Sequence, residues 1–423
     1  MVYKQHNMGS YTIHTIKTDR FKNIGIEVVF RNNVDPKRCA LRTCLFDVLL
    51  ENNLEYKTKR DMILMQEELY NSLLYSVTYK VGATAISSVV LDMLNPKYAD
   101  YNYLDDAIKY LFTAIFNPNI TNNEFDEQTL NTVKNRLIAD IKTVKENPTK
   151  HALQNALKVM DEESLSALNI AGTVETVESI TPSKLYEEYK EVLEHDYIDI
   201  YVIGDFNENE VIDSISNYAK FNTIKTHEVE INNTNKTRKK AIEQRDESNN
   251  AQSQVVLIYN TNDLTDYEKK YTFQIYNMVL GGGSLETKLY HKLRDENSLC
   301  YSLRSMYQKY DDLLIIGTSV DKSNVSLAIK LIKETIKEML TEVTDEEIAT
   351  AVNSKISAIN MAFDEPGRII DEYLFRNISD LDDAETRIEE YKNITKEMVM
   401  NVAKKISLNT IYVLEGGDSN EEN

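Results

Sequence analysis

The stretch GGGSLETKLYHKLRDENSLCYS, residues 281–302, opens with three adjacent glycines and then carries Arg294 and Tyr301. Phosphate-binding loops place such glycines between a strand and a helix, with G-K-[ST] or G-x-G-x-x-G spacing. Neither spacing is present, and the preceding YEKKYTFQIYNMVL has a helical pattern. We therefore predict a turn between two helices, with glycine at the C-cap of the first and Ser284 as a candidate N-cap of the second.

A second copy of this pattern lies in the first half of the chain. LLYS ends a similar helical segment there, with Tyr75 at the position of Tyr301. The triplet Ala-Ile-Lys, centred on Ile108, recurs 221 residues later around Ile329, and a proline follows it in both halves. Landmarks that keep one order at nearly constant offsets indicate a long internal repeat.

The repeat sets the expected fold class. The β-branched runs at 24–30 and 254–260 predict strands, while apolar residues at three- and four-residue spacing predict long helices elsewhere. Because strands and helices are mixed without regular βαβ alternation, we expect an α+β fold. It would have two homologous domains, each a mostly antiparallel sheet covered by helices on one face. We place them at residues 1–224 and 253–423, with the polar, charged residues 225–252 as a linker.

Composition excludes several function classes. The formal net charge of -20 argues against nucleic-acid binding, which needs basic faces. The sequence contains no run of eighteen apolar residues, so we expect no membrane span. The N-terminal segment lacks an apolar signal core, and the three cysteines form no C-x-x-C pair, so we expect a reduced, cytoplasmic chain. Cys39, Cys44 and Cys300 are expected to face the core rather than to react.

VLGGGSLETKLYHKLRDENSLCYS resembles the second-domain signature of the insulinase-like zinc peptidases, the pitrilysin or processing-peptidase superfamily (M16). The resemblance extends over nearly the whole chain, since IYVIGDFN resembles the strand that ends the first domain of that family. It implies a processing-peptidase-like fold in which Arg294 and Tyr301 bind the backbone of an extended peptide. A guanidinium and a phenol can both donate hydrogen bonds to peptide carbonyls.

Active members of this family carry an H-x-x-E-H motif on the first helix of the first domain. Its two histidines bind zinc, its glutamate activates the metal-bound water, and a glutamate on a later helix is the third protein ligand. None of the six histidines of this chain has another four residues away. By the resemblance, the motif falls on Thr43, Phe46 and Asp47 in RCALRTCLFDVLLENN, and the third ligand position on Asp140. Phe46 cannot act as a base, so no catalytic residue and no metal ligand are assigned; weak binding of a hard cation by the two aspartates stays open.

One segment imitates the zinc motif. EVLEH, residues 191–195, matches H-x-x-E-H except that Glu191 stands for the first histidine. The segment directly precedes the strand YIDIYVIGDF, where the family has only the end of a helix. We therefore interpret it as a charged helix C-terminus, with His195 near the negative end of the helix dipole.

The resemblance and the missing ligands imply a non-catalytic member of the family, similar to those found beside active members in low-GC Gram-positive bacteria. Such a chain is expected to be the substrate-binding subunit of a heterodimeric zinc metallopeptidase, with the zinc in a sister subunit and no cofactor of its own. Two alternatives remain: a non-proteolytic peptide- or protein-binding scaffold, and an active metallopeptidase with an atypical Asp47/Asp140 metal site. Pairing with a second copy of the chain also stays open.

Overall fold

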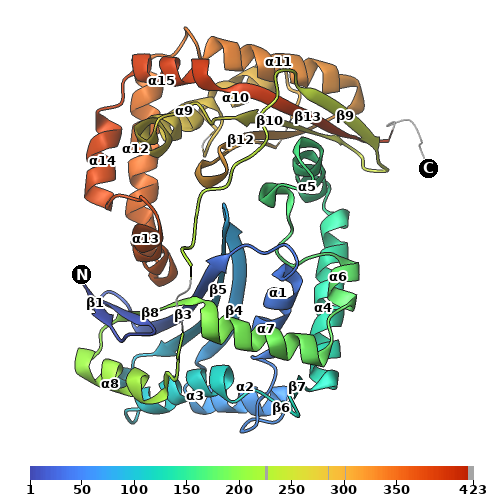
Figure 1. Cartoon of the computed structure of the whole chain (residues 1–423). Coiled ribbons are helices and arrows are strands. Elements are labelled where there is room, and N and C mark those ends of the chain that lie inside the picture. The colour runs from blue at the N-terminus through green and yellow to red at the C-terminus, as the bar shows by residue number, and fades with distance from the viewer. Residues whose placement is uncertain (224–226, 284, 301, 418–423) are drawn as a thin grey trace. The chain divides into compact units, whose positions relative to one another are not determined.

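The computed structural model describes residues 1–223, 227–283, 285–300 and 302–417, and the chain divides into two compact units (Figure 1). Unit 1 comprises Met1–Lys142, Asn169–Ile231 and Glu365–Leu374. Unit 2 comprises Thr143–Leu168, Asn232–Asp364 and the chain from Phe375 onward.

Unit 1 is built on a six-stranded sheet with the strand order β1-β2-β8-β3-β5-β4. Its neighbouring strands are antiparallel except β2 and β8, and in the central pair Val28 of β3 lies opposite Val89 of β5. The strands of unit 1 are β1 (Val2–Asn7), β2 (Thr12–Lys17), β3 (Asn23–Asn33), β4 (Leu73–Val81), β5 (Thr84–Leu94), β8 (Tyr197–Gly204) and the short pair β6 (Ile120–Thr121) and β7 (Glu124–Phe125).

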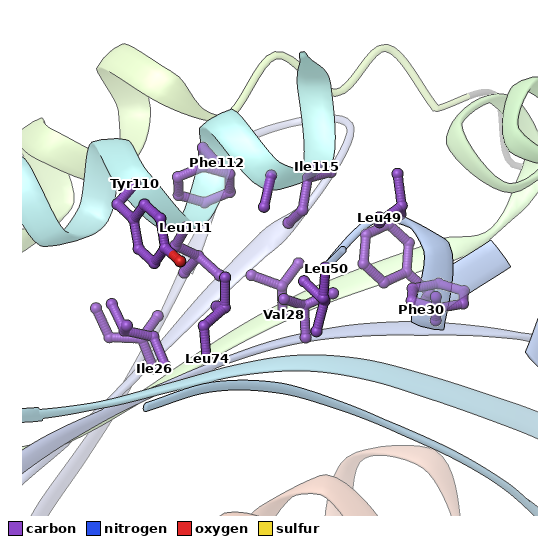
Figure 2. Packing of buried hydrophobic residues seen from close by; sticks show 14 of the residues in the cluster. Ile26, Val28, Phe30, Leu49, Leu50, Leu74, Tyr110, Leu111, Phe112 and Ile115 are labelled. Atoms are coloured by element: carbon purple, nitrogen blue, oxygen red, sulfur yellow. The ribbon is translucent and has the colours of Figure 1, made fainter. Parts of the chain in front are cut away.

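Helices cover one face of this sheet because both surfaces present apolar side chains at the matching period. Ile26 and Val28 of β3 meet Leu111 and Ile115 of α3, and Leu50 fills the space beside them (Figure 2). The helices of unit 1 are α1 (Cys39–Val48), α2 (Lys59–Glu68), α3 (Leu104–Phe116), α4 (Glu127–Glu146, up to Lys142), α6 (Val174–Glu178), α7 (Pro182–His195), α8 (Glu208–Tyr218) and α13 (Pro366–Ile378, up to Leu374).

Unit 2 is built on a five-stranded sheet with the order β11-β12-β10-β13-β9. Its strands are β9 (Ile242–Glu247), β10 (Ser253–Asn260), β11 (Leu303–Gln308), β12 (Leu313–Val320) and β13 (Ser407–Glu415). Its helices are α5 (Pro148–Met160), α9 (Phe273–Leu280), α10 (Lys288–Tyr290), α11 (Val325–Glu338), α12 (Asp345–Ala362), α14 (Ala384–Lys392) and α15 (Lys396–Val402), with π-helical turns η3 (Glu268–Thr272) and η4 (His291–Asp295) and the 3₁₀ turn η5 (Lys309–Asp311).

The two sheets share one topology, which confirms the predicted duplication and the α+β class. The order β2-β8-β3-β5-β4 in unit 1 corresponds to β9-β13-β10-β12-β11 in unit 2. The pairing senses agree as well, since β2 and β8 are parallel, as are β9 and β13, while all other neighbours in the two series are antiparallel. Each sheet is therefore mostly antiparallel, as expected.

The predicted linker at 225–252 contains a strand, which corrects that interpretation. Within it, β9 pairs in parallel with β13, with Ile242 opposite Thr410 and Glu247 opposite Glu415. β9 lies at the edge of the sheet, and most of its side chains are exposed, so its sequence IEQRDE carries no apolar run. Backbone hydrogen bonds to β13 stabilise this strand. Because such bonds do not depend on apolar side chains, the hydrophobic pattern of the sequence does not predict the strand.

Each unit also includes one helix from the other half of the sequence. In unit 2, α5 packs on β10 and β13, where Ala152 and Ala156 contact Ile258 and Tyr412 (Figure 1). In unit 1, α13 is held by Tyr373, whose ring stacks on that of Tyr3 at 4.3 Å. The sheet of unit 2 is therefore covered on both faces, which goes beyond the single covered face expected. The division into homologous halves at 1–224 and 253–423 stays a prediction.

Candidate functional site

The positions of the zinc motif lie on α1, whose buried residues face the sheet of unit 1. Thr43 is partly buried, and its hydroxyl donates a hydrogen bond of 2.9 Å to the backbone oxygen of Ile170. The hydroxyl proton is thus directed to a carbonyl, and a neutral alcohol is a poor substitute for the imidazole that zinc prefers.

Phe46, at the position of the catalytic glutamate, belongs to the hydrophobic core. Its side chain is fully buried and meets the ring of Phe30 edge-on, with the centroids 5.1 Å apart. The guanidinium of Arg42 lies 5.6 Å from the Phe46 ring and is itself paired with the buried Asp196 at 2.6 Å. A benzyl side chain cannot accept a proton from water, so Phe46 cannot take the place of the catalytic glutamate.

Asp47 is engaged by protein groups on two sides. One carboxylate oxygen accepts a hydrogen bond of 3.0 Å from the Ser76 hydroxyl, and the other lies 3.4 Å from the guanidinium of Arg136 on α4. Arg136 also donates to Glu51, in the turn that follows α1, at 2.8 Å. Partial burial alone would lower the pKa of Arg136, but the hydrogen bond to Glu51 and the charge of Asp47 raise it overall. A permanent cation therefore lies beside the one charged group of the former motif.

Asp140, at the third ligand position, is exposed on α4 one turn beyond Arg136. Across residues 1–223, 227–283, 285–300 and 302–417, no three His, Cys, Asp or Glu side chains are grouped as they would be to hold a metal ion. The side chains at the four motif positions do not fit zinc. They are an alcohol, a benzyl ring, an aspartate paired with arginine and a solvent-facing aspartate. A guanidinium next to Asp47 would also repel an incoming cation.

The imitation motif at 191–195 forms the end of α7, as predicted. The imidazole of His195 lies 3.8 Å from the Glu191 carboxylate, whose other oxygen accepts from Arg38 at 3.2 Å. Arg38 in turn makes a two-point contact with the buried Glu188. These contacts tie α7 to the start of α1, and they give Glu191 and His195 a structural role.

The glycine stretch joins two helices, which confirms that prediction. α9 ends at Leu280 and α10 begins at Lys288, and Gly283 has a φ of +99°, in the region that favours glycine. At Gly282 a Cβ would lie 2.5 Å from the Nδ2 atom of Asn277. Ser284, the candidate cap, lies outside the described residues; the N-cap of α10 is Thr287, whose side chain makes no capping hydrogen bond.

Arg294 lies in η4 directly after α10, partly buried. Its guanidinium is placed over the ring of Tyr290, 5.7 Å from the centroid. Tyr290 also lines a cavity of about 440 Å³ in unit 2, together with Val256 of β10 and Arg304 of β11. Tyr301, the predicted companion of Arg294, lies outside the described residues. The geometry of the pair therefore stays a prediction; Arg294 itself lies over Tyr290, which is one of the residues that line this cavity.

A feature of unit 1 that the sequence reasoning missed is the edge strand β4. Among the described strands, β4 pairs with β5 and has no partner on its other side. Leu73, Tyr75 and Val77 alternate along it, with 56%, 46% and 41% of their surfaces exposed. The alternation LLYSVTYKV was visible in the sequence, but the position of β4 at the edge was not.

The cysteines are buried, as expected. Burial is the largest cause that raises the pKa of the Cys39 thiol to about 11 and that of Cys44 to about 12. Both are therefore protonated thiols near neutral pH, which excludes them as nucleophiles.

None of the helices among the described residues combines the length and hydrophobicity needed to cross a bilayer.

Fold and site together define a class: an α+β protein with a duplicated, mostly antiparallel sheet and a peptidase-like first helix that lacks the groups for zinc-dependent hydrolysis. Residues 179–355 match the family model described as the peptidase M16 inactive domain. The probable inactive metalloprotease YmfF of Bacillus subtilis (strain 168) is 25% identical over 421 residues, which cover 96% of each chain. This chain is thus similar over part of its length to the M16 inactive-domain model, and over nearly its whole length to a probable inactive metalloprotease.

Two solved structures have the same fold. A conserved protein from Enterococcus faecalis V583 matches with a TM-score of 0.91 at 24% identity, over 99% of this chain and all of that one. A peptidase M16 inactive domain from Pseudomonas fluorescens matches with a TM-score of 0.79 at 16% identity, over the full length of both chains. The fold expected from the sequence is thus confirmed by proteins of known structure.

Proposed function

We propose that this chain is the non-catalytic, substrate-binding subunit of a heterodimeric zinc metallopeptidase that acts on peptides, with the zinc held by a sister subunit in the cytoplasm. The observation that carries the proposal is the substitution at the zinc motif, where Phe46 is part of the core and Arg136 pairs with Asp47. This arrangement supplies neither a base nor a ligand set. The same observation argues against an active peptidase with an atypical Asp47/Asp140 site.

The edge strand β4 supports peptide binding. An extended peptide can add to an exposed sheet edge through main-chain hydrogen bonds, while pockets for alternate side chains give specificity. Long apolar edges are usually protected in proteins because they invite aggregation. An edge that instead exposes Leu73, Tyr75 and Val77 is the kind of surface that a peptide ligand would cover.

Arg294 supports the same role from unit 2. Its guanidinium lies over the ring of Tyr290, which lines the cavity, and arginine offers five donors to peptide carbonyls or to a carboxylate. With Tyr301 it would form the peptide-binding pair that the family resemblance implies. We assign both residues to substrate binding within this proposal.

The test is a reconstitution. A zinc-bearing M16 subunit from the same organism is assayed on an unstructured peptide with and without this chain. We expect this chain alone to cleave nothing, and the mixture to cleave faster than the zinc subunit alone. Arg294→Ala should lower kcat/KM of the mixture at least tenfold, whereas Arg245→Ala on β9, paired with Glu243 and Glu415 at the surface, should leave it unchanged.

The alternatives give different outcomes. A scaffold of the same fold would bind the zinc subunit or a peptide without changing the cleavage rate, and Arg294→Ala would then have no effect. Cleavage by this chain alone, abolished by a chelator, would contradict the proposal directly. Sedimentation of the chain alone and of the mixture would distinguish a pair of identical copies from a heterodimer.

A further inference from the structure

The cavity of unit 2 that Tyr290 lines has an apolar floor. Its volume is about 440 Å³, which lies in the range of roughly 300–1,000 Å³ that is common for ligand sites. It is bounded by α5 and by the strands β10, β12 and β11. Apolar side chains of all four elements contribute to its lining: Leu153, Val256, Met306 and Ile315. An apolar group can therefore be buried there.

A glycine leaves the space for this cavity. Gly317 of β12 lies opposite Val256 of β10 on one side and opposite Arg304 of β11 on the other. Nothing lies within 4 Å of a Cβ at this position. In the interior of a strand, glycine often marks a site where a ligand or another backbone approaches closely. The sheet is thus open at Gly317, although its neighbours on both strands carry side chains.

The charged residues that line the cavity are both cations. They are Lys150 of α5 and Arg304 of β11, and both are exposed. In the part of the chain that the structure describes, no Asp or Glu lines the cavity, and no carboxylate pairs with either cation. The two cations give the site a formal charge of about +2 within a chain of net charge -20. A local positive charge of this kind attracts an anionic ligand.

A buried amide in the lining has donor capacity left. The hydroxyls of Thr149 and Ser319 donate to the side-chain oxygen of Gln254 at 3.0 and 2.8 Å, and Ser302 donates to Ser319 at 3.1 Å. Gln254 is only 6% exposed, and within the described residues its amide nitrogen has no hydrogen-bond partner. Because two hydroxyls fix the oxygen, the NH₂ group remains available to a carbonyl of a ligand.

We propose that this cavity binds the C-terminal residue of a peptide, with an apolar side chain in the cavity and the free α-carboxylate held by Lys150 and Arg304. The inference rests on the proposed function, since it names the end of the peptide that the subunit would bind. A guanidinium can donate to both oxygens of a carboxylate. An acidic side chain would leave the apolar floor unused, and a fatty acid has no peptide carbonyl for Gln254. A C-terminal apolar residue satisfies all three features.

The test is an equilibrium binding measurement on the full chain, without any zinc subunit. The probe is a fluorescein-labelled hexapeptide of glycine and serine that ends in leucine, prepared with a free C-terminal carboxylate and as the C-terminal amide. Fluorescence anisotropy at constant ionic strength gives both Kd values. We expect the carboxylate form to bind at least about fivefold more tightly than the amide. In a double variant, Lys150→Gln with Arg304→Gln, this ratio should fall to about one.

Two further variants separate the apolar part of the site from its charge. Gly317→Val fills the cavity, and because its Cβ meets no close neighbour and valine favours strands, the fold should be kept. It should weaken binding of both peptide forms at least about tenfold. Lys158→Gln is the matched control for the cations, since it removes a charge from an exposed position of the same helix outside the cavity. It should retain the ratio of the unchanged chain.

Other results would overturn the proposal. Equal Kd values for the two peptide forms, or a ratio that survives in the double variant, would exclude the carboxylate site. Unchanged binding in Gly317→Val would exclude the cavity, once circular dichroism shows that the variant is folded. Binding of decanoate but not of the peptide would assign the cavity to a free fatty acid. None of these Kd values depends on cleavage, so failure here leaves the stimulation of a zinc subunit untouched, and failure of that stimulation leaves these Kd values unchanged.

Discussion

At the scale of single residues, the loss of the zinc site is a matter of side-chain chemistry and surroundings. The sequence was enough to place Thr43, Phe46 and Asp47 at the motif and to exclude a general base. It could not show that Arg136 neutralises Asp47, because the two residues are 89 positions apart and meet only when α4 packs beside α1. Partners brought together by tertiary packing are the part of a site that a motif cannot describe.

Restoring the catalytic glutamate alone should damage the protein. Phe46→Glu would put a carboxylate into a fully buried position against Phe30 of β3. We expect the free energy of unfolding to fall by about 3 kcal/mol or more, since a buried charge without a partner is costly. Phe46→Leu should cost less than about 2 kcal/mol because it keeps most of the apolar volume. Urea unfolding of both variants checks this, and equal stability of the two would contradict the assigned core role.

A second residue prediction concerns Glu27 on β3. Burial, its largest cause, together with the nearby carboxylate of Asp371 on α13, raises the pKa of Glu27 to about 7, from an ordinary value of 4.5. The folded state therefore holds this proton more tightly than the unfolded state. The contribution of Glu27 is fully favourable below about pH 4.5 and is lost as the pH rises through about 7.

Glu27→Gln should remove this dependence. We expect the variant to be more stable than the unchanged chain at pH 8, by about 1–3 kcal/mol, and to show a flatter stability between pH 5 and 8. Chemical unfolding at a series of pH values measures both. A variant with the same slope as the unchanged chain would show that Glu27 titrates normally.

At the scale of elements, strands and helices with an apolar period were predictable, and the exceptions have a common cause. The run that became β3 and the long helices bury mainly one face, and the run that became β10 is buried on both. β9 and the edge position of β4 escaped prediction, because edge strands are defined by what their backbone pairs with and not by a hydrophobic period. The π-helical turns η3 and η4 could not be predicted from the apolar periodicity either, because each shifts the helical register by one residue.

The glycine turn allows an element-level test. At Gly282 an added Cβ would approach the backbone oxygen of Asn277 to 2.9 Å, and backbone cannot move aside as a side chain can. Gly282→Ala should therefore lower the stability by about 1–3 kcal/mol. Gly367→Ala is the control: nothing lies within 4 Å of its Cβ, and alanine favours α13 by up to about 1 kcal/mol. Equal Tm values for the two variants would contradict this account of the turn.

At the scale of the whole molecule, the two halves share a topology but exchange a helix. The repeat predicted two similar domains, and the matching strand orders confirm the similarity. The exchange could not be foreseen, because the apolar face of a helix does not identify the sheet that it will cover. For α5, the buried Ala152, Ala156 and Met160 pack against strands of unit 2.

The exchange predicts that the halves fold poorly apart. A fragment of residues 1–224 would expose the apolar face of α5 and lack α13, while residues 241–423 would lack α5. We expect each fragment alone to show poor solubility or no cooperative thermal transition, and co-expression to recover a folded complex. Circular dichroism and size-exclusion chromatography check this. A first fragment that unfolds cooperatively by itself would contradict the importance of the exchange.

The most direct test of the central claim is a zinc titration of the purified, metal-free chain by calorimetry, with Asp47→Ala beside it. The substituted motif predicts no stoichiometric binding and identical traces for the two proteins. One zinc per chain, lost in Asp47→Ala, would contradict the claim that this chain has no metal site of its own.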